Sequence, residues 1–341
     1  MNNTSLLIGK ANNKNIRHEI SCNINNSITN HENILVFSDN VSYYSDFLRK
    51  LNEEEYNTYI LNLKDSSHSN GFNPFILPYK YYKSGKKDKA VEMLESIGHE
   101  ICKEKNSNSD PFWENSATSY FTTLALILFK EGSYDEINLG SIQTMLTLGE
   151  KEFEDTNLIK KYFSTLDIMD PIYVFGSQVI YSPSETRASI ISVLKQKLNL
   201  YCTKEILLNN LCNNEIDLSI LNNKTAIFII SDTKYNGISN ILINQIFNQN
   251  KEFSYYIDKI EKLNSITELE NMIDNNEKIF ITSSSKQEIS DIYGNNLINN
   301  INYVKDVKEE YEILDKCNIN LPDTKINKHN YFNIEDFIKK C

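Results

Sequence analysis

Short apolar runs alternate with helix-length amphipathic segments at both ends of this chain, and that alternation constrains its fold more than any other feature. Buried strands of a parallel sheet are continuous apolar runs, because helices cover both faces of such a sheet. The pattern predicts strands over residues 5–8, 34–37 and 56–63, with a helix over 41–51. The beginning of the chain is therefore predicted to be α/β.

The middle of the chain has helical spacing instead. Predicted helices cover residues 86–103, 110–130, 141–148, 157–166 and 185–201. The α/β pattern then returns, with predicted strands at 226–230, 253–257 and 278–282 and predicted helices at 238–248 and 266–273. We therefore predict four parts: the first part of an α/β core over 1–77, an all-α insertion over 78–221, the second part of the core over 222–310, and a polar C-terminal tail over 311–341 with a short final helix at 334–340.

Composition argues against several classes of function. A net charge of −11 is unlike that of proteins that grip nucleic acid by themselves, which usually present a basic face. The six cysteines form no C-x-x-C pair, so no zinc site is indicated. The longest apolar stretch, residues 120–129, is much shorter than the ~18 residues needed to span a bilayer. We therefore expect a cytoplasmic protein without a transmembrane segment.

The turn after the first predicted strand lies where a phosphate-binding loop would occur. Such a loop needs glycines so that backbone N–H groups surround the phosphates, a lysine that reaches the β- and γ-phosphates, and a hydroxyl that binds Mg²⁺. Gly9 remains, but alignment on the following helix places Asn15 at the lysine position and Ile16 at the hydroxyl position. Either a diverged loop uses Lys10 or Lys14, or the segment is a polar turn without a ligand.

Two acidic residues follow predicted strands, as acids that handle phosphate or metal often do. Asp39 comes after the strand at 34–37, where a turn or helix cap is the simpler interpretation. Asp258 comes after the strand at 253–257 and would bind Mg²⁺ only if a nucleotide binds. The next residue is Lys259, which cannot act as a carboxylate toward an attacking water.

The sequence DPFWE at residues 110–114 has the form of a helix start, with Asp110 as the N-cap and a proline in the first turn. It contains Trp113, the only tryptophan of the chain. Trp113 could fill the core of the helical insertion, or it could serve with Phe112 as a partner-docking anchor, since buried aromatic side chains dominate binding hot spots.

Several stretches, taken in order, resemble one protein family. These stretches are residues 34–64, the Asn-Pro pair at 73–74, DPFWE at 110–114 with Ala117, residues 185–190 and residues 224–233. The family is the TraG-type coupling ATPases of conjugation and type IV secretion. The resemblance covers about residues 5–305 and implies a RecA-like P-loop NTPase core with an inserted all-α domain.

The chain departs from that family in the parts that would hydrolyse a nucleotide. The loop lysine and hydroxyl are replaced, and the Asp-Glu pair that ends a core strand in the family is Asp258-Lys259 here. The family's glutamine at the end of the next strand falls at Thr282. The transmembrane helices that usually begin the family's proteins are absent from this sequence.

The resemblance and the departures together imply a catalytically degenerate coupling-protein homologue, a pseudo-ATPase that acts as an adaptor or regulator in conjugative DNA transfer or type IV secretion. Its partners would be an active coupling ATPase paralogue from the same mobile element, or other type IV secretion and relaxosome proteins, with DNA reached only indirectly. No cofactor is expected, and any attachment to the membrane would be peripheral, through a secretion complex.

Two other hypotheses stay open. The first is a divergent active NTPase that uses Mg·ATP to drive DNA or protein transfer, with Lys10 or Lys14 in the loop. The second is a decaying remnant of a mobile element that has no present role.

Overall fold

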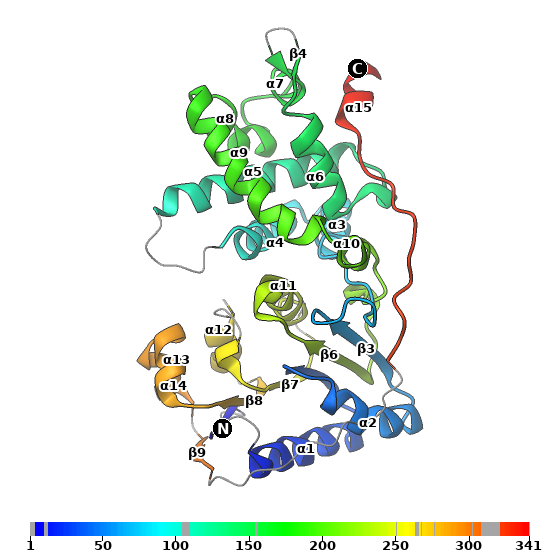
Figure 1. The fold of residues 1–341 in the computed structure, drawn as a ribbon, viewed down its shortest axis with the longest axis vertical. Helices are drawn as coiled ribbons and strands as arrows, with labels where there is room; N and C mark the ends of the chain where they lie inside the picture. Colours follow the sequence, from blue (N-terminus) through cyan, green and yellow to red (C-terminus); the bar gives the residue numbers. More distant parts are fainter. Residues whose placement is uncertain are drawn as a thin grey trace. The chain divides into compact units, whose positions relative to one another are not determined.

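The protein is described from a computed structural model. The described residues are 4–9, 13–103, 110–153, 156–249, 251–262, 266, 268–275, 277–301, 303–307 and 321–340. The chain forms two compact units, which are an α/β unit of Met1–Asn70 and Leu218–Thr324 and a helical unit of Gly71–Asp217 and Lys325–Cys341 (Figure 1). The borders expected from the sequence, at 77/78 and 221/222, each lie a few residues later.

The end of the chain differs from the polar tail expected over 311–341. From Lys325 onward it belongs to the helical unit, where Phe332 and Ile334 are buried. The short helix α15 (Ile334–Lys340) forms where it was predicted. Residues 308–320, also part of the expected tail, lie outside the described part of the chain. The apolar residues of this segment, such as Phe332 and Ile334, can be read in the sequence, but which unit buries them cannot.

The α/β unit contains a parallel sheet of seven strands. In spatial order they are β3 (Asn57–Asn62), β6 (Thr225–Ile230), β2 (Asn33–Ser38), β7 (Phe253–Ile257), β8 (Lys278–Ser283), β1 (Thr4–Ile8) and β9 (Tyr303–Asp306). All but β9 overlap predicted apolar runs. β9 pairs only with β1, and its side chains are exposed or half-buried, so its sequence carries no apolar run that would predict a strand.

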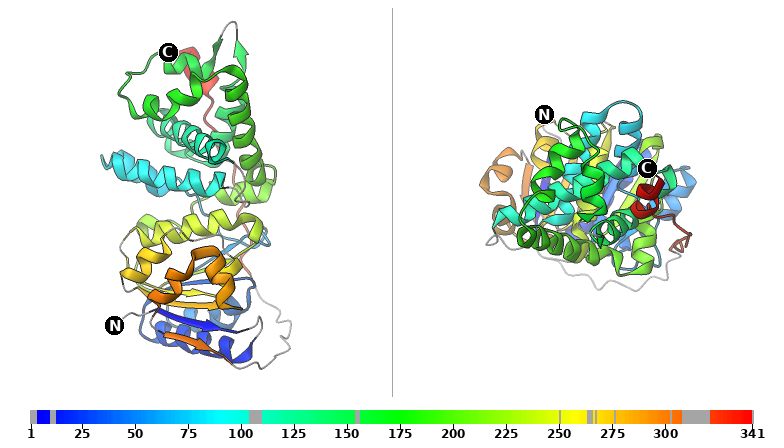
Figure 2. Two further views of the ribbon diagram at one scale, coloured as in Figure 1. Left: turned by 90° about the vertical axis from the view of Figure 1, so that its left-hand side faces the viewer. Right: turned by 90° about the horizontal axis from the view of Figure 1, so that it is seen from above.

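Helices cover both faces of this sheet (Figures 1 and 2). They are α1 (Lys14–Thr29) and α2 (Ser42–Glu53) on one face, and α11 (Asn236–Phe247) and α12 (Leu269–Asp274) on the other, while α13 (Lys286–Tyr293) and α14 (Asn295–Asn300) follow β8. Alternate strand residues, such as Ile34 and Val36 in β2, form one core with α1 and α2. The intervening Leu35 and Phe37 are fully buried as well, which is why β2 is apolar throughout.

The helical unit is organised around α5. Its elements are α3 (Ile76–Lys83), α4 (Lys87–Cys102), α5 (Pro111–Glu131), α6 (Leu139–Leu148), α7 (Leu158–Phe163), α8 (Pro171–Ile180), α9 (Ser184–Cys202), α10 (Glu205–Cys212), α15 and a small antiparallel pair, β4 (Glu152–Phe153) and β5 (Thr156–Asn157). Helix α5 contacts α4, α6, α8 and α9, and its residues from Tyr120 to Phe129 are all buried. A helix that is apolar on every side must lie in the interior, as this one does.

Two stretches that resemble the coupling-protein family build the interior of the helical unit. Asn73 is buried, and its Nδ2 donates to the carbonyl oxygen of Ile137 at 2.7 Å. Arg187, in α9, forms an ion pair of 2.6 Å with Glu150. The Tyr120 hydroxyl donates to the same carboxylate. These residues therefore tie the segments between helices to the interior of the helical unit.

Within the described residues, no helix has both the length and the apolar character required to cross a membrane.

Candidate functional site

The carboxyl ends of four parallel strands bring distant residues to one edge of the sheet. Strand β1 runs into Gly9, β2 into Asp39 and β7 into Asp258, while Thr282 lies near the end of β8. In open α/β sheets, ligands bind outside these carboxyl ends. The spatial order β2-β7-β8-β1 therefore places the residues predicted from the sequence around one candidate site, which we call the carboxyl edge.

Asp39 is held by two lysines at the carboxyl edge. Its Oδ2 lies 2.9 Å from Nζ of Lys259 and also accepts a hydrogen bond from Nζ of Lys262. Burial alone would raise the pKa of Asp39, but the hydrogen bonds and positive charges of both lysines hold it well below its usual range. Asp39 therefore stays ionised as the partner of two ammonium groups.

Asp258 is buried between these groups and β8. Its Oδ1 accepts a hydrogen bond of 2.7 Å from the Thr282 hydroxyl, and that hydroxyl accepts one of 2.8 Å from the backbone N–H of Lys259. Burial raises the pKa of Asp258, while the bond from Thr282 and the charge of Lys259 oppose the rise. The threonine thus takes part in fixing both the acid and the residue that follows it.

The backbone at Lys259 is unusual. Its φ of 61° lies in the left-handed region, which costs an ordinary L-residue roughly 1 kcal/mol. The conformation aims Lys259 at Asp39, at the end of the neighbouring strand β2.

The start of α1 is closed by the protein's own side chains. Asn13 is the N-cap, and its Oδ1 accepts a hydrogen bond of 3.0 Å from the N–H of Asn15, a donor that a phosphate-binding loop would direct at its ligand. The Ile16 side chain is buried against Gly9, where an added Cβ would lie 2.8 Å from Ile16 Cδ1. Lys14 is exposed at the first residue of the helix.

The structure separates the remaining predicted site residues. Lys10 lies outside the described residues. Asp110, Phe112 and Trp113 belong to the helical unit, where Asp110 caps α5 by accepting a hydrogen bond of 3.0 Å from the N–H of Phe112. Trp113 is only half-buried and stacks edge-on against Phe112, with ring centroids 5.1 Å apart. It therefore does not fill the core of the helical unit.

Sequence reasoning missed Lys262. The short 3-10 helix Ile260–Lys262 carries its ammonium group back to Asp39, which is 223 residues away in the chain. A second lysine three residues after Lys259 was the only available signal, and many surface segments have that spacing.

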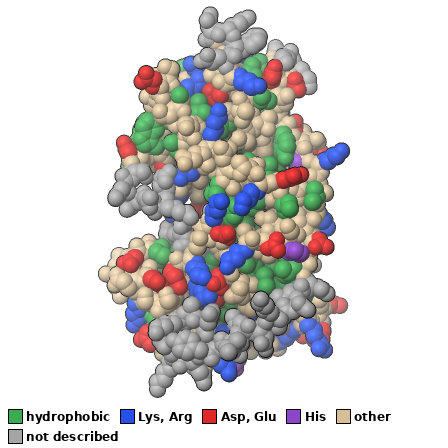
Figure 3. All heavy atoms as spheres, viewed as in Figure 1, with side chains coloured by type: hydrophobic (Ala, Val, Ile, Leu, Met, Phe, Trp, Pro, Cys, Tyr) green, Lys and Arg blue, Asp and Glu red, His purple; other side chains and the backbone are tan. Residues whose placement is uncertain are grey.

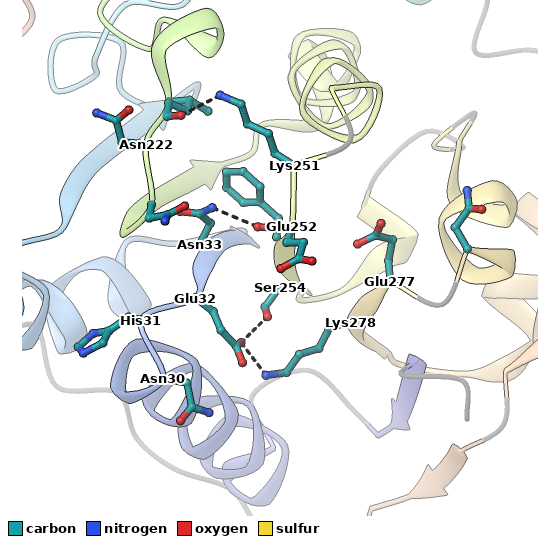
Figure 4. Close-up of a pocket in the computed structure, with 14 residues that line it drawn as sticks. Asn30, His31, Glu32, Asn33, Asn222, Lys251, Glu252, Ser254, Glu277 and Lys278 are labelled. Carbon is teal, nitrogen blue, oxygen red and sulfur yellow. Dashed lines mark hydrogen bonds and ion pairs between the residues drawn. The ribbon is translucent and has the colours of Figure 1, made fainter.

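A cavity of about 1240 Å³ lies at the opposite edge of the sheet, beside the amino ends of β2, β6, β7 and β8 (Figure 4). Some of its polar groups bond one another. The Glu32 carboxylate accepts hydrogen bonds of 2.7 Å from both Ser254 and Lys278, as Figure 4 shows. Burial opposes ionisation of Glu32, but these bonds and one from Ser27 lower its pKa overall. Among the residues the structure describes, no cluster of His, Cys, Asp or Glu side chains could hold a metal ion.

A family model for type IV secretory system conjugative DNA transfer proteins matches residues 21–274, which is most of the chain. The chain belongs to this family. The match begins after the loop at residues 9–16 and ends before β8, so the loop and Thr282 lie outside it. A comparison with curated proteins gave no match.

Solved structures of a conjugative coupling protein share the fold of this family member. One is the bacterial conjugative coupling protein TrwBdeltaN70 with sulphate, at 11% identity and a TM-score of 0.57, covering 88% of this chain and 69% of that one. Another is the plasmid coupling protein TrwB with the GTP analogue GDPNP, at 12% identity and a TM-score of 0.55, covering 87% and 67%. The fold is therefore a RecA-like P-loop NTPase core with an all-α domain, as the sequence predicted.

The described residues of the carboxyl edge do not fit a magnesium-bound nucleotide. Mg²⁺ takes oxygen ligands, usually carboxylates, phosphates and water. Here Ile16 supplies only carbon where the resemblance implies a hydroxyl. Asp39 is already neutralised by Lys259 and Lys262, and the N–H of Asn15 is bonded within the protein.

Proposed function

We propose that this member of the conjugative DNA transfer family works without hydrolysing a nucleotide, as an adaptor or regulator of the transfer apparatus. The observation that carries the proposal is the ion pair of 2.9 Å between Lys259 and Asp39, because Lys259 stands where the resemblance implies a glutamate. In phosphoryl transfer, a residue that accepts a hydrogen bond orients the attacking water. An ammonium group has no lone pair with which to do so.

The partners we propose are proteins of the same apparatus, namely an active coupling ATPase paralogue or other type IV secretion and relaxosome components. DNA would be reached only through them. The net charge of −11 supports this view, and acidic and basic side chains are interspersed over the face shown in Figure 3. The protein would then act in the cytoplasm, next to the membrane through the secretion complex.

Calorimetry with Mg·ATP tests the proposal directly. The purified chain and its Asp258→Ala variant are titrated with nucleotide to millimolar concentration, and phosphate release is followed in parallel. We expect no saturable heat and equal, background phosphate release from both proteins. Hydrolysis that disappears in Asp258→Ala would overturn the proposal, because the buried acid would then be serving a working site.

One observation favours the alternative of a divergent active NTPase. Lys14 is exposed at the first residue of α1, from which a long side chain could reach an anion near the helix N-terminus. Under that alternative, Mg·ATP would bind, and Lys14→Ala would weaken the binding, whereas Lys50→Ala on α2 would not. Under our proposal, neither substitution changes the calorimetric trace.

A further inference from the structure

The last described residues of the chain lie on the helical unit as an extended peptide. Residues 325–333 have no regular secondary structure, and α15 then packs against α6 and α7 (Figure 1). Most of the polar contacts in this segment involve its main chain, and they come from side chains of α10, of α6 and of the residue before α6. A surface that binds main-chain groups recognises an extended conformation more than a particular sequence.

Two asparagines of α10 and its C-cap bind the first part of this segment. Nδ2 of Asn209 donates to the carbonyl oxygen of Lys325 at 2.8 Å, while Oδ1 of Asn209 accepts from the N–H of Asn327 at 3.0 Å. Nδ2 of Asn213 donates to the same carbonyl oxygen at 2.8 Å. An amide side chain carries both a donor and an acceptor, so one asparagine can bind a C=O and an N–H of the same peptide.

The second part is bound in the same way beside α6. Asn138, the N-cap of α6, donates to the carbonyl oxygen of Asn330 at 3.0 Å. The hydroxyl of Ser141 accepts from the N–H of Phe332 at 2.9 Å. Four main-chain positions of the segment are therefore bonded by side chains of the helical unit.

Apolar side chains of the segment then enter the helical unit. Phe332 and Ile334 are 4% and 0% exposed. The ring of Tyr331 lies directly on Gly140, where an added Cβ would stand 2.1 Å from Tyr331 Cε1. Gly140 has no side chain, and this close approach requires that it have none. The groove thus combines main-chain recognition with seats for two adjacent aromatic side chains and an aliphatic one.

The segment does not fill its groove. A cavity of about 470 Å³ remains beside it, lined both by the helical unit, including Asn73 and Asn213, and by residues 327–330.

We propose that the groove of α6 and α10 is a docking site for an extended peptide of a partner protein, and that residues 325–338 occupy it as a built-in competitor. The partner peptide has free main-chain groups followed by two adjacent aromatic residues. An aliphatic residue stands two positions after the second aromatic residue, as Ile334 follows Phe332 in the chain's own segment. Its docking displaces the chain's own segment. The inference deepens the proposed adaptor function by giving the adaptor a site for its partner.

The probe for this site is a labelled synthetic peptide of residues 325–341, followed by fluorescence anisotropy against the full-length chain. In the native chain the tethered segment competes, so binding is weak. The double variant Phe332→Ala and Ile334→Ala loses the buried anchors of the tethered segment and leaves the groove unchanged. We expect it to bind the peptide roughly 100-fold more tightly than the native chain does, because the competing state is depopulated.

Modified peptides separate main-chain recognition from general stickiness. N-methylation at Asn327 or Phe332 removes a donor that the groove uses and should weaken binding roughly 10-fold. N-methylation at Lys328, whose N–H has no acceptor among the described residues, is the matched control and should cost less. On the protein side, Gly140→Ala is added to the double variant Phe332→Ala and Ile334→Ala, which we call the released variant. The added methyl group should occupy the space where the Tyr331 ring lies on Gly140 and weaken binding of the peptide by a similar factor.

The released variant must retain the native circular dichroism spectrum. If it does and the peptide still does not bind, or if all N-methylated peptides bind alike, the docking site is refuted. If the double variant does not fold, the single variant Phe332→Ala replaces it, since it removes one of the two buried anchors and keeps Ile334 in place. The peptide measurements contain no nucleotide. Detection of ATP hydrolysis in the separate calorimetric test would therefore overturn the proposed function but leave the result for the peptide groove unchanged.

Discussion

Each unit of this protein contains a largely buried ion pair, and the two pairs have different surroundings. In the helical unit, the side chains of Arg187 and Glu150 are each 8% exposed, and the Tyr120 hydroxyl also donates to Glu150. At the carboxyl edge of the α/β unit, the side chains of Lys259 and Asp39 are 12% and 16% exposed. The first pair joins α9 to the turn after α6 without a left-handed residue, whereas in the second Lys259 has a left-handed backbone.

The two pairs contact different kinds of neighbours. Arg187 lies in a stretch that resembles the coupling-protein family, and its role here is to hold the interior of the helical unit. Lys259 stands where the resemblance implies a glutamate, and its contact neutralises Asp39, an acid at the same edge. The pair in the helical unit thus organises packing, while the pair at the carboxyl edge neutralises an acid at the side of the sheet where ligands of open α/β folds bind.

The largest effect is expected for Arg187→Ala. Removing one partner of a buried pair leaves the Glu150 charge uncompensated, which typically costs about 3–5 kcal/mol of the free energy of unfolding. Denaturant unfolding followed by circular dichroism measures the loss. Arg49→Ala is the control, because its pair with Glu53 is exposed and should contribute nothing measurable. Equal stability of the two variants would show that the pair in the helical unit is dispensable.

A smaller effect, about 1–3 kcal/mol, is expected for Lys259→Ala, since Lys262 still neutralises Asp39. Lys259→Gly loses the same ion pair but relieves the left-handed backbone at φ 61°, so it should be more stable than the alanine variant by roughly 1 kcal/mol. The same unfolding experiment compares the two variants. If the glycine variant is the less stable, the conformation at Lys259 is not strained.

The two acids of the carboxyl edge should respond to pH in opposite directions. The pKa of Asp39 is lowered, so its contribution to stability is present at neutral pH and is lost as the pH falls below about 4. The pKa of Asp258 is raised, so the native protein gains stability relative to Asp258→Asn as the pH falls from 7 through that raised pKa toward about 4.

Unfolding curves of the native protein, Asp39→Asn and Asp258→Asn between pH 7 and pH 3 test this pair of signs. The cost of Asp39→Asn should shrink at the acidic end, and any advantage of Asp258→Asn should be greatest at neutral pH. Parallel curves for all three proteins would mean that neither acid is perturbed.

The smallest effect concerns the start of α5 in the helical unit. Asp110→Ala removes the side-chain acceptor for the N–H of Phe112 and should cost about 1 kcal/mol. Asp110→Asn keeps an acceptor and should be nearly neutral. Thermal unfolding distinguishes the two variants. A loss of equal size in both would assign the effect to charge rather than to capping.

The amount of the fold that could be predicted depended on how completely each element is buried. Strand β7 (Phe253–Ile257) was predicted at its observed bounds, and β6 within one residue, because both are buried along their whole length. Helix α5 was recognised from its cap and its apolar run. Strand β9 was missed because only its backbone pairing makes it a strand. The packing of residues 325–340 was missed because asparagine side chains, rather than an apolar pattern, hold much of that segment.

The sequence by itself determined the order of the α/β and helical parts, the family, and the residue types at Asn15, Ile16 and Lys259, the positions on which the hypothesis of a degenerate site rests. Those are local properties, since apolar periodicity, caps and residue types can be read along the chain. Only the tertiary structure decided that Asp39 meets Lys259 and Lys262, and that Asn209 binds the main chain beyond Lys325. These contacts join residues more than a hundred positions apart, and such pairs form only when the parallel sheet and the packed helices bring them together.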